Sequence, residues 1–149
     1  MEFFVDTSSL AKRYLNEIGS GWVLSWIEPP ASNIIIVSEL AQVEMYSIFA
    51  RRQRETTLNA TNAAILQTDF LFHTEKEYLV VPIDTAILVQ ARQLLIKHPL
   101  RTLDAIQLSC AIQSVTLLGS PITFISSDKN LLAAATTEGF VTDDPNAHP

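Results

Sequence analysis

Glycine, cysteine and histidine are scarce in this chain of 149 residues, and their scarcity excludes several kinds of site. The four glycines form no glycine-rich phosphate loop, and no G-x-S-x-G nucleophile elbow is present. The single cysteine, Cys110, cannot form an internal disulfide, and its apolar surroundings indicate a core residue. The histidines His73, His98 and His148 are scattered, and no pair has the spacing of zinc ligands.

Long apolar runs and basic charge are also missing. No apolar run approaches the ~20 residues that cross a bilayer, and the first residues, MEFFVDTSSL, have no secretory pattern, so we expect a cytoplasmic protein without a membrane partner. The net charge of −6 argues against a general nucleic-acid coat protein, although it permits an enzyme that touches nucleic acid locally. With 48% hydrophobic residues, residues 1–149 are long enough for one domain with one core.

Short apolar strands alternate with longer helical patterns along the chain. The predicted strands are 2–5, 33–38, 78–83, 121–126 and a short one at 140–142. The predicted helices are 8–15, 20–27, 39–54, 57–76, 84–98 with Asp84 as N-cap, one that contains Asp104, and 128–138 ending before Gly139. This alternation predicts an α/β fold with a mostly parallel sheet, and runs such as IIIV indicate strands that are covered on both faces.

Two aspartates directly follow predicted strands. Asp6 comes after FFV, and Asp128 comes shortly after TFI. Because ligands of open parallel sheets bind outside the carboxyl ends of the strands, both side chains are expected at the ligand-binding edge. Each aspartate taken alone is better explained as a simple N-cap of the following helix.

Two further acids lie within predicted helices. Glu44 has apolar residues four positions away on either side, Leu40 and Ile48, and a predicted mid-helix position that leaves no capping role. A glutamate at the margin of the apolar stripe, reaching solvent, is the alternative. Asp104 lies in an otherwise apolar pattern, where it could instead pair with Gln107 in a capping box or favour the helix dipole.

Taken together, the four acids favour a metal site. Several carboxylates at one sheet edge repel one another, and a hard divalent cation removes that repulsion. Mg²⁺ prefers oxygen ligands and retains several waters, and it can polarise a phosphoryl oxygen and activate water. This pattern predicts a Mg²⁺ site for phosphoryl chemistry.

Four segments, in this order along nearly the whole chain, resemble the PIN-domain ribonucleases of the VapC toxin type: FVDTSSLAKRYL, VSELAQVEMYSIFARR, LRTLDAIQLSCAI and TFISSDKNLLAAATTEGF. The resemblance implies a three-layer α/β/α sandwich and a Mg²⁺- or Mn²⁺-dependent endoribonuclease that cuts RNA. It also implies a cognate antitoxin and a homodimer as partners. Ser109 stands where the family often has alanine, which leaves the acids untouched.

The family's acidic catalytic and metal site maps onto Asp6, Glu44, Asp104 and Asp128. The hydroxyl residues Ser8 and Ser126 match positions that would support these acids or hold water. Candidate RNA contacts are the following basic residues: Arg51, seven residues beyond Glu44, and Lys12 and Arg13, which follow Asp6.

Two other functions remain open at this stage. The first is a non-catalytic PIN-like module that binds RNA or a protein through the same acidic notch. The second is a phosphatase with Asp6 as covalent nucleophile, although such enzymes generally carry a second aspartate where this chain has Ser8.

Overall fold

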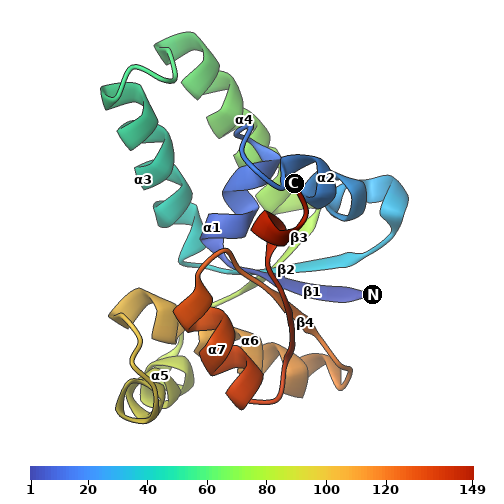
Figure 1. Cartoon of the computed structure of the whole chain (residues 1–149), viewed down its shortest axis with the longest axis vertical. Helices are drawn as coiled ribbons and strands as arrows, with labels where there is room; N and C mark the ends of the chain where they lie inside the picture. The colour runs from blue at the N-terminus through green and yellow to red at the C-terminus, as the bar shows by residue number, and fades with distance from the viewer.

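Figure 1 shows the computed structural model of the chain, which describes residues 1–149. Five strands form one sheet in the order β3-β2-β1-β4-β5, and every neighbouring pair is parallel. The strands are β1 (Glu2–Val5), β2 (Ile34–Ser38), β3 (Tyr78–Val81), β4 (Thr123–Ile125) and β5 (Val141–Asp143). The chain builds outward from β1 through β2 to β3 and then crosses to β4 on the other side of β1. The strand order therefore reverses between β1 and β4.

Helices cover both faces of the sheet (Figure 1). One face carries α1 (Thr7–Leu10), α2 (Ser20–Ile27), α3 (Ala41–Arg54) and α4 (Ala60–Lys76), whose buried residues form one core with the sheet. The other face carries α5 (Thr85–Lys97), α6 (Thr102–Leu118) and α7 (Lys129–Thr137) over a second core. Three short 3₁₀ turns complete the chain: η1 (Ala11–Arg13), η2 (Pro29–Ala31) and η3 (Pro145–Ala147). This arrangement is the expected three-layer α/β/α sandwich.

The apolar strands alternate between the two cores. On β1, Phe3 and Val5 belong to the first core, whereas Phe4 belongs to the second, where its ring stacks on Phe124 with centroids 5.4 Å apart. Because successive strand residues point to opposite faces, a strand covered on both sides needs apolar residues at every position. This requirement explains the unbroken apolar runs of the sequence.

The predicted elements are confirmed, except that one predicted helix is divided and two helices start later than expected. Segment 8–15 is wrong as one helix, because α1 gives way to η1, where the Tyr14 N–H bonds the Ala11 carbonyl and tightens the turn. The helix predicted from residue 39 begins at Ala41, since 39–40 form a turn. The helix predicted from residue 57 begins at Ala60, with Asn59 as its cap. Asp84 caps α5 as predicted.

Two further expectations concern Cys110 and membrane-spanning helices. Cys110 is a fully buried free thiol, as its apolar surroundings predicted. None of the helices combines the length and the apolar character needed to cross a membrane.

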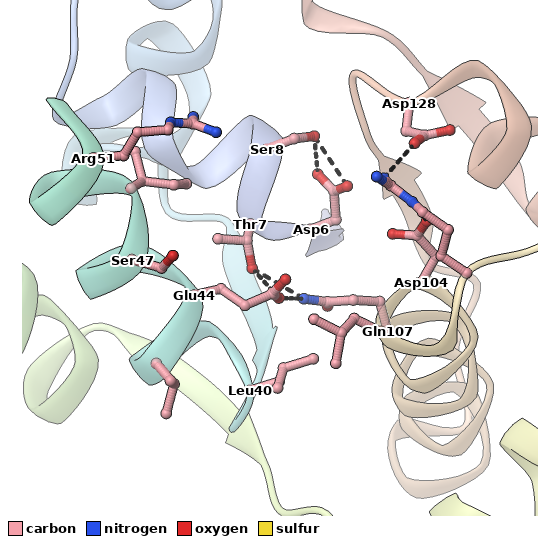
Figure 2. Close-up of a pocket in the computed structure, with 14 residues that line it drawn as sticks. Asp6, Thr7, Ser8, Leu40, Glu44, Ser47, Arg51, Asp104, Gln107 and Asp128 are labelled. Carbon is pink, nitrogen blue, oxygen red and sulfur yellow. Dashed lines mark hydrogen bonds and ion pairs between the residues drawn. The ribbon is translucent and has the colours of Figure 1, made fainter. Parts of the chain in front are cut away.

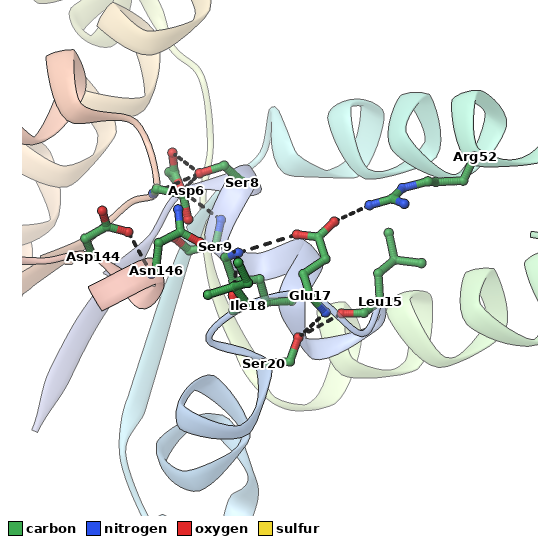
Figure 3. A network of polar contacts seen from close by, with 12 residues as sticks. Asp6, Ser8, Ser9, Leu15, Glu17, Ile18, Ser20, Arg52, Asp144 and Asn146 are labelled. Carbon is green, nitrogen blue, oxygen red and sulfur yellow. Dashed lines mark hydrogen bonds and ion pairs between the residues drawn. The ribbon is translucent and has the colours of Figure 1, made fainter. Parts of the chain in front are cut away.

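The end of the chain packs against the segment that follows β1. The buried Lys12 ammonium donates to the Asn146 side chain at 2.9 Å and to the Ile18 carbonyl at 2.8 Å. The Trp22 and His148 rings stack with centroids 4.1 Å apart. Figure 3 shows Asn146 beside this segment. The C-terminal turn η3 therefore packs against Lys12 and the start of α2.

Gly19 is the residue that permits this contact. Its φ is +83°, and an added Cβ would lie 2.1 Å from the Pro145 carbonyl oxygen. We predict that Gly19→Ala lowers the free energy of unfolding by about 2 kcal/mol or more, because both the backbone and the contact are strained. Urea unfolding measures this change. Gly21→Ala is the matched control, since its Cβ meets nothing within 4 Å and alanine favours α2 by about 0.5–1 kcal/mol. Equal effects of the two substitutions would contradict the prediction.

Candidate active site

A pocket of about 560 Å³ opens at the carboxyl edge of the sheet, beside the reversal between β1 and β4. All four predicted acids line it (Figure 2): Asp6, Glu44, Asp104 and Asp128. They come from four separate segments, namely the end of β1, the first turn of α3, the first turn of α6 and the cap of α7. The fold thus brings together residues that are far apart in the sequence.

Asp6 is the most buried of the four acids, with 4% of its surface exposed. Its carboxylate accepts hydrogen bonds from the Ser9 backbone N–H at 3.0 Å and from the Ser8 and Ser126 hydroxyls, both at 2.7 Å. The Ser9 bond caps α1, so the capping interpretation of Asp6 is also correct. Asp6 can cap α1 and also line the acidic pocket, because its carboxylate has two oxygens.

Burial raises the pKa of Asp6 to about 6, although its hydrogen-bond donors act in the opposite direction. The group is therefore mostly ionised at pH 7. No lysine, arginine or histidine forms an ion pair with it. Asp6 is thus a buried anion. Its hydrogen-bond donors are neutral groups, and no cationic side chain pairs with it.

Ser8 and Ser126 connect Asp6 to the loop that carries Asp128. The Ser127 N–H donates to Ser8 Oγ at 3.1 Å, and the Asp128 N–H donates to Ser126 Oγ at 3.0 Å. One Asp128 oxygen caps α7 through the Leu131 N–H at 3.0 Å. The two serines therefore fix the spacing between Asp6 and Asp128, which agrees with the supporting position expected for them.

Glu44 is held by neutral donors from two elements (Figure 2). Its Oε1 accepts from the Thr7 hydroxyl and from the Gln107 amide, both at 2.8 Å. The expected mid-helix position is wrong, because α3 begins at Ala41 and Glu44 lies in its first turn. Its other oxygen, Oε2, makes no hydrogen bond within the protein. Glu44 thus keeps one oxygen for a ligand.

Asp104 has a different partner from the one considered in the sequence. Gln107 contacts Glu44 and Thr7, so the capping-box interpretation is wrong, while a first-turn acid in α6 is confirmed. Asp104 Oδ2 instead accepts from Arg101 Nε at 3.0 Å. Sequence reasoning missed Arg101, Thr7 and the contact of Gln107. The i, i+3 spacing of Arg101 and Asp104 was the available signal for the first of these.

Of the three basic candidates, only Arg51 lines the pocket. It is exposed on α3 and has no ion-pair partner. Lys12 is 5% exposed and bonds Glu17, the Ile18 carbonyl and Asn146. The Arg13 side chain is 3% exposed and contacts Glu77 and Tyr78, both at 2.7 Å. Neither Lys12 nor Arg13 reaches the pocket, so we do not retain them as RNA contacts.

The phosphatase alternative gains no support from the structure. Such enzymes generally carry a second aspartate two residues after the nucleophile. Ser8 stands at that position, and its hydroxyl donates to the Asp6 carboxylate.

The donor set fits a hard divalent cation. Every candidate ligand is a carboxylate oxygen, and Asp6 is an anion without a counter-ion. In the present side-chain arrangement, no group of three or more acids is positioned to hold a metal ion together. Mg²⁺ does not need three protein ligands, because it is commonly held by one or two carboxylates and several waters.

The uncompensated charge of Asp6 predicts a pH-dependent stability. With a folded pKa of about 6 and an unfolded value of about 3.9, folding favours the protonated form. This contribution to stability is complete below pH 4 and is lost as the pH rises through about 6, a change of about 3 kcal/mol. We therefore predict that Asp6→Asn, in EDTA, is more stable than the wild type at pH 7 and that this advantage shrinks at pH 4.5.

Urea unfolding at the two pH values measures both differences. Asp69→Asn, an exposed position on α4, is the control for loss of a negative charge. An Asp6→Asn protein less stable than the wild type at pH 7 would show that the carboxylate is adequately neutralised without a cation.

Comparisons with known proteins agree with the fold. The sequence matches the model of the PIN domain family over residues 3–136. The chain is similar to the crystal structure of PAE2754 from Pyrobaculum aerophilum, with a TM-score of 0.67 and 15% identity over 99% of this chain and 91% of that one. It is also similar to FitAcB from Neisseria gonorrhoeae, with a TM-score of 0.63 and 14% identity over 96% of this chain and 97% of that one. No curated protein matches the chain significantly.

The family match spans all four acidic residues of the pocket. The two solved structures support the same five-stranded α/β architecture at low sequence identity. The chain belongs to the PIN domain family.

Proposed function

We propose that this protein is an endoribonuclease that hydrolyses RNA phosphodiester bonds with the help of Mg²⁺ or Mn²⁺. The observation that carries the proposal is that three other carboxylates share one pocket with Asp6, a buried anion that has no cationic partner. Membership of the PIN domain family, whose members are generally nucleases, supports the same conclusion.

The residues that would hold the ion are Asp6, Glu44, Asp104 and Asp128. When bound, the ion would polarise the scissile phosphate and offset the charge that develops during hydrolysis. Ser8 and Ser126 fix the Asp6 carboxylate, so its orientation is set before substrate arrives. Thr7 and Gln107 do the same for Glu44 Oε1, which leaves Oε2 available to the ion.

The RNA strand needs positive charge near these acids. Arg51 lines the same pocket from α3 and is not committed to any carboxylate. Its guanidinium is therefore available to bind a backbone phosphate, for which a planar arginine fork is well suited.

We extend the proposal to a toxin of a toxin–antitoxin pair, with an antitoxin that covers the pocket and a second copy of this chain as partners. The resemblance to VapC-type sequences supports this role. The pocket rim adds a physical reason, because Val43 is 71% and Leu103 is 45% exposed there. Exposed apolar side chains beside an acidic pocket favour burial against a protein partner.

The proposal predicts metal-dependent RNA cleavage by the purified chain. A mixed, structured RNA pool incubated with Mg²⁺ or Mn²⁺ should yield fragments, and EDTA should abolish them. We expect Asp6→Asn and Asp104→Asn to lower the cleavage rate by about 100-fold or more, because each removes an oxygen ligand. Asp69→Asn, outside the pocket, should cleave like the wild type.

Two results would contradict this account. If the Asp104→Asn variant kept full metal-dependent cleavage, the proposed mechanism would be wrong. Failure of a folded, Mn²⁺-binding protein to cut any RNA in the pool would favour the non-catalytic binding module.

Two arginines on α3 provide a matched test of RNA contact. Arg51 and Arg54 are both exposed, but only Arg51 lines the pocket. We predict that Arg51→Ala raises the KM for RNA by about 5- to 20-fold, the effect of losing one phosphate contact, while Arg54→Ala changes it less than about 2-fold. If steady-state kinetics gave both variants the same KM for RNA, the overall charge of the protein, and not a contact of Arg51, would account for RNA binding.

A further inference from the structure

Arg101 lies between two of the four acids that line the pocket, Asp104 and Asp128. Its Nε donates to Asp104 Oδ2 at 3.0 Å, and its Nη2 donates to Asp128 Oδ2 at 3.1 Å. The proximity of both carboxylates raises the pKa of the guanidinium, chiefly through the bond to Asp104. The single positive charge of Arg101 thus neutralises two carboxylates that would also bind a divalent cation.

Nothing else holds this side chain in place. It is 80% exposed, and its only hydrogen bonds and ion pairs are those to the two aspartates. Arg101 is the residue before α6, where its side chain contributes no capping bond. Exposed ion pairs in water are weak, so a ligand that competes for the carboxylates displaces the guanidinium readily.

We propose that Arg101 is a resident counter-ion that a divalent cation displaces, and that the released guanidinium then binds an RNA phosphate at the mouth of the pocket. This inference rests on the function proposed above. In the metal-free protein, Arg101 separates Asp104 from Asp128 and limits their repulsion. In the metal-bound protein, the cation takes over that role, and Arg101 and Arg51 are the only basic side chains that line the pocket.

The chemistry of arginine suits both states. The guanidinium presents several N–H groups in one plane, which allows it to bridge two carboxylates and, later, to donate two bonds to one phosphate. Lysine carries the same charge on a single nitrogen and cannot bridge in the same way. Arg101→Lys therefore separates the effect of shape from that of charge.

The proposal predicts opposite effects of one substitution on two ligands. Arg101→Ala frees Asp104 and Asp128, so Mn²⁺ should bind about 3- to 10-fold more tightly in the absence of RNA, the order expected for losing a competing charge at short range. The same variant should raise the KM for RNA by about 5- to 20-fold at saturating Mn²⁺, with kcat changed much less. A residue with a merely structural role would weaken both interactions or neither.

The decisive experiment titrates Mn²⁺ alone into the full chain and follows the free ion by electron paramagnetic resonance. Wild type, Arg101→Ala, Arg101→Gln and Arg101→Lys are compared, with Arg92→Ala as control because Arg92 is exposed on α5 and lies outside the pocket. We expect tighter binding for Arg101→Ala and Arg101→Gln, a smaller gain for Arg101→Lys, and the wild-type affinity for Arg92→Ala. Circular dichroism checks that each variant is folded.

The outcomes separate this inference from the proposed function. If the wild type binds Mn²⁺ and cuts RNA but Arg101→Ala binds Mn²⁺ no more tightly, the counter-ion role is overturned and the nuclease stands. If the wild type binds no Mn²⁺, both proposals fail. A tighter Mn²⁺ site with an unchanged KM for RNA would overturn the phosphate contact.

Discussion

The buried negative charge of Asp6 is the constraint on which the rest of the site depends. The residue follows the central strand β1, where β2 and β4 on either side and helices on both faces keep bulk water away. Two serine hydroxyls and one backbone N–H solvate the carboxylate, but burial still raises its pKa to about 6. Each further acid nearby adds repulsion, so an acidic pocket at this position requires positive charge from elsewhere.

The other three acids are held in two ways. Glu44 is held by neutral donors, Thr7 and Gln107, which fix its position without reducing the negative charge of the pocket. Asp104 and Asp128 share the guanidinium of Arg101, which does reduce it. Hydrogen bonds and ion pairs within the protein therefore set the positions of the four carboxylates before any ion binds, and we propose that a divalent ion would replace the contact that Arg101 supplies. Preorganised ligands of this kind lose little entropy on binding.

The strands and the acids that directly follow them depend on local sequence, so they could be predicted. Asp6 and Asp128 follow short apolar strands, and a parallel sheet places both at its carboxyl edge. Side-chain partners depend on tertiary packing and could not be predicted. Gln107 turns to Glu44 across the pocket rather than to its helix neighbour, and Lys12 is buried because the distant C-terminal turn supplies its acceptor. The sequence pattern grouped the four acids and the family resemblance matched them, whereas the contacts of Arg101 with two of them emerged only from the fold.

The central claim is that the pocket binds a divalent cation next to Asp6. Anomalous diffraction from a crystal soaked in Mn²⁺ tests it most directly. The account predicts one strong manganese peak in the pocket, in contact with the Asp6 carboxylate, and an Arg101 guanidinium that has left the position between Asp104 and Asp128. A pocket without manganese, or a peak that leaves Asp6 without a metal contact, would contradict the account.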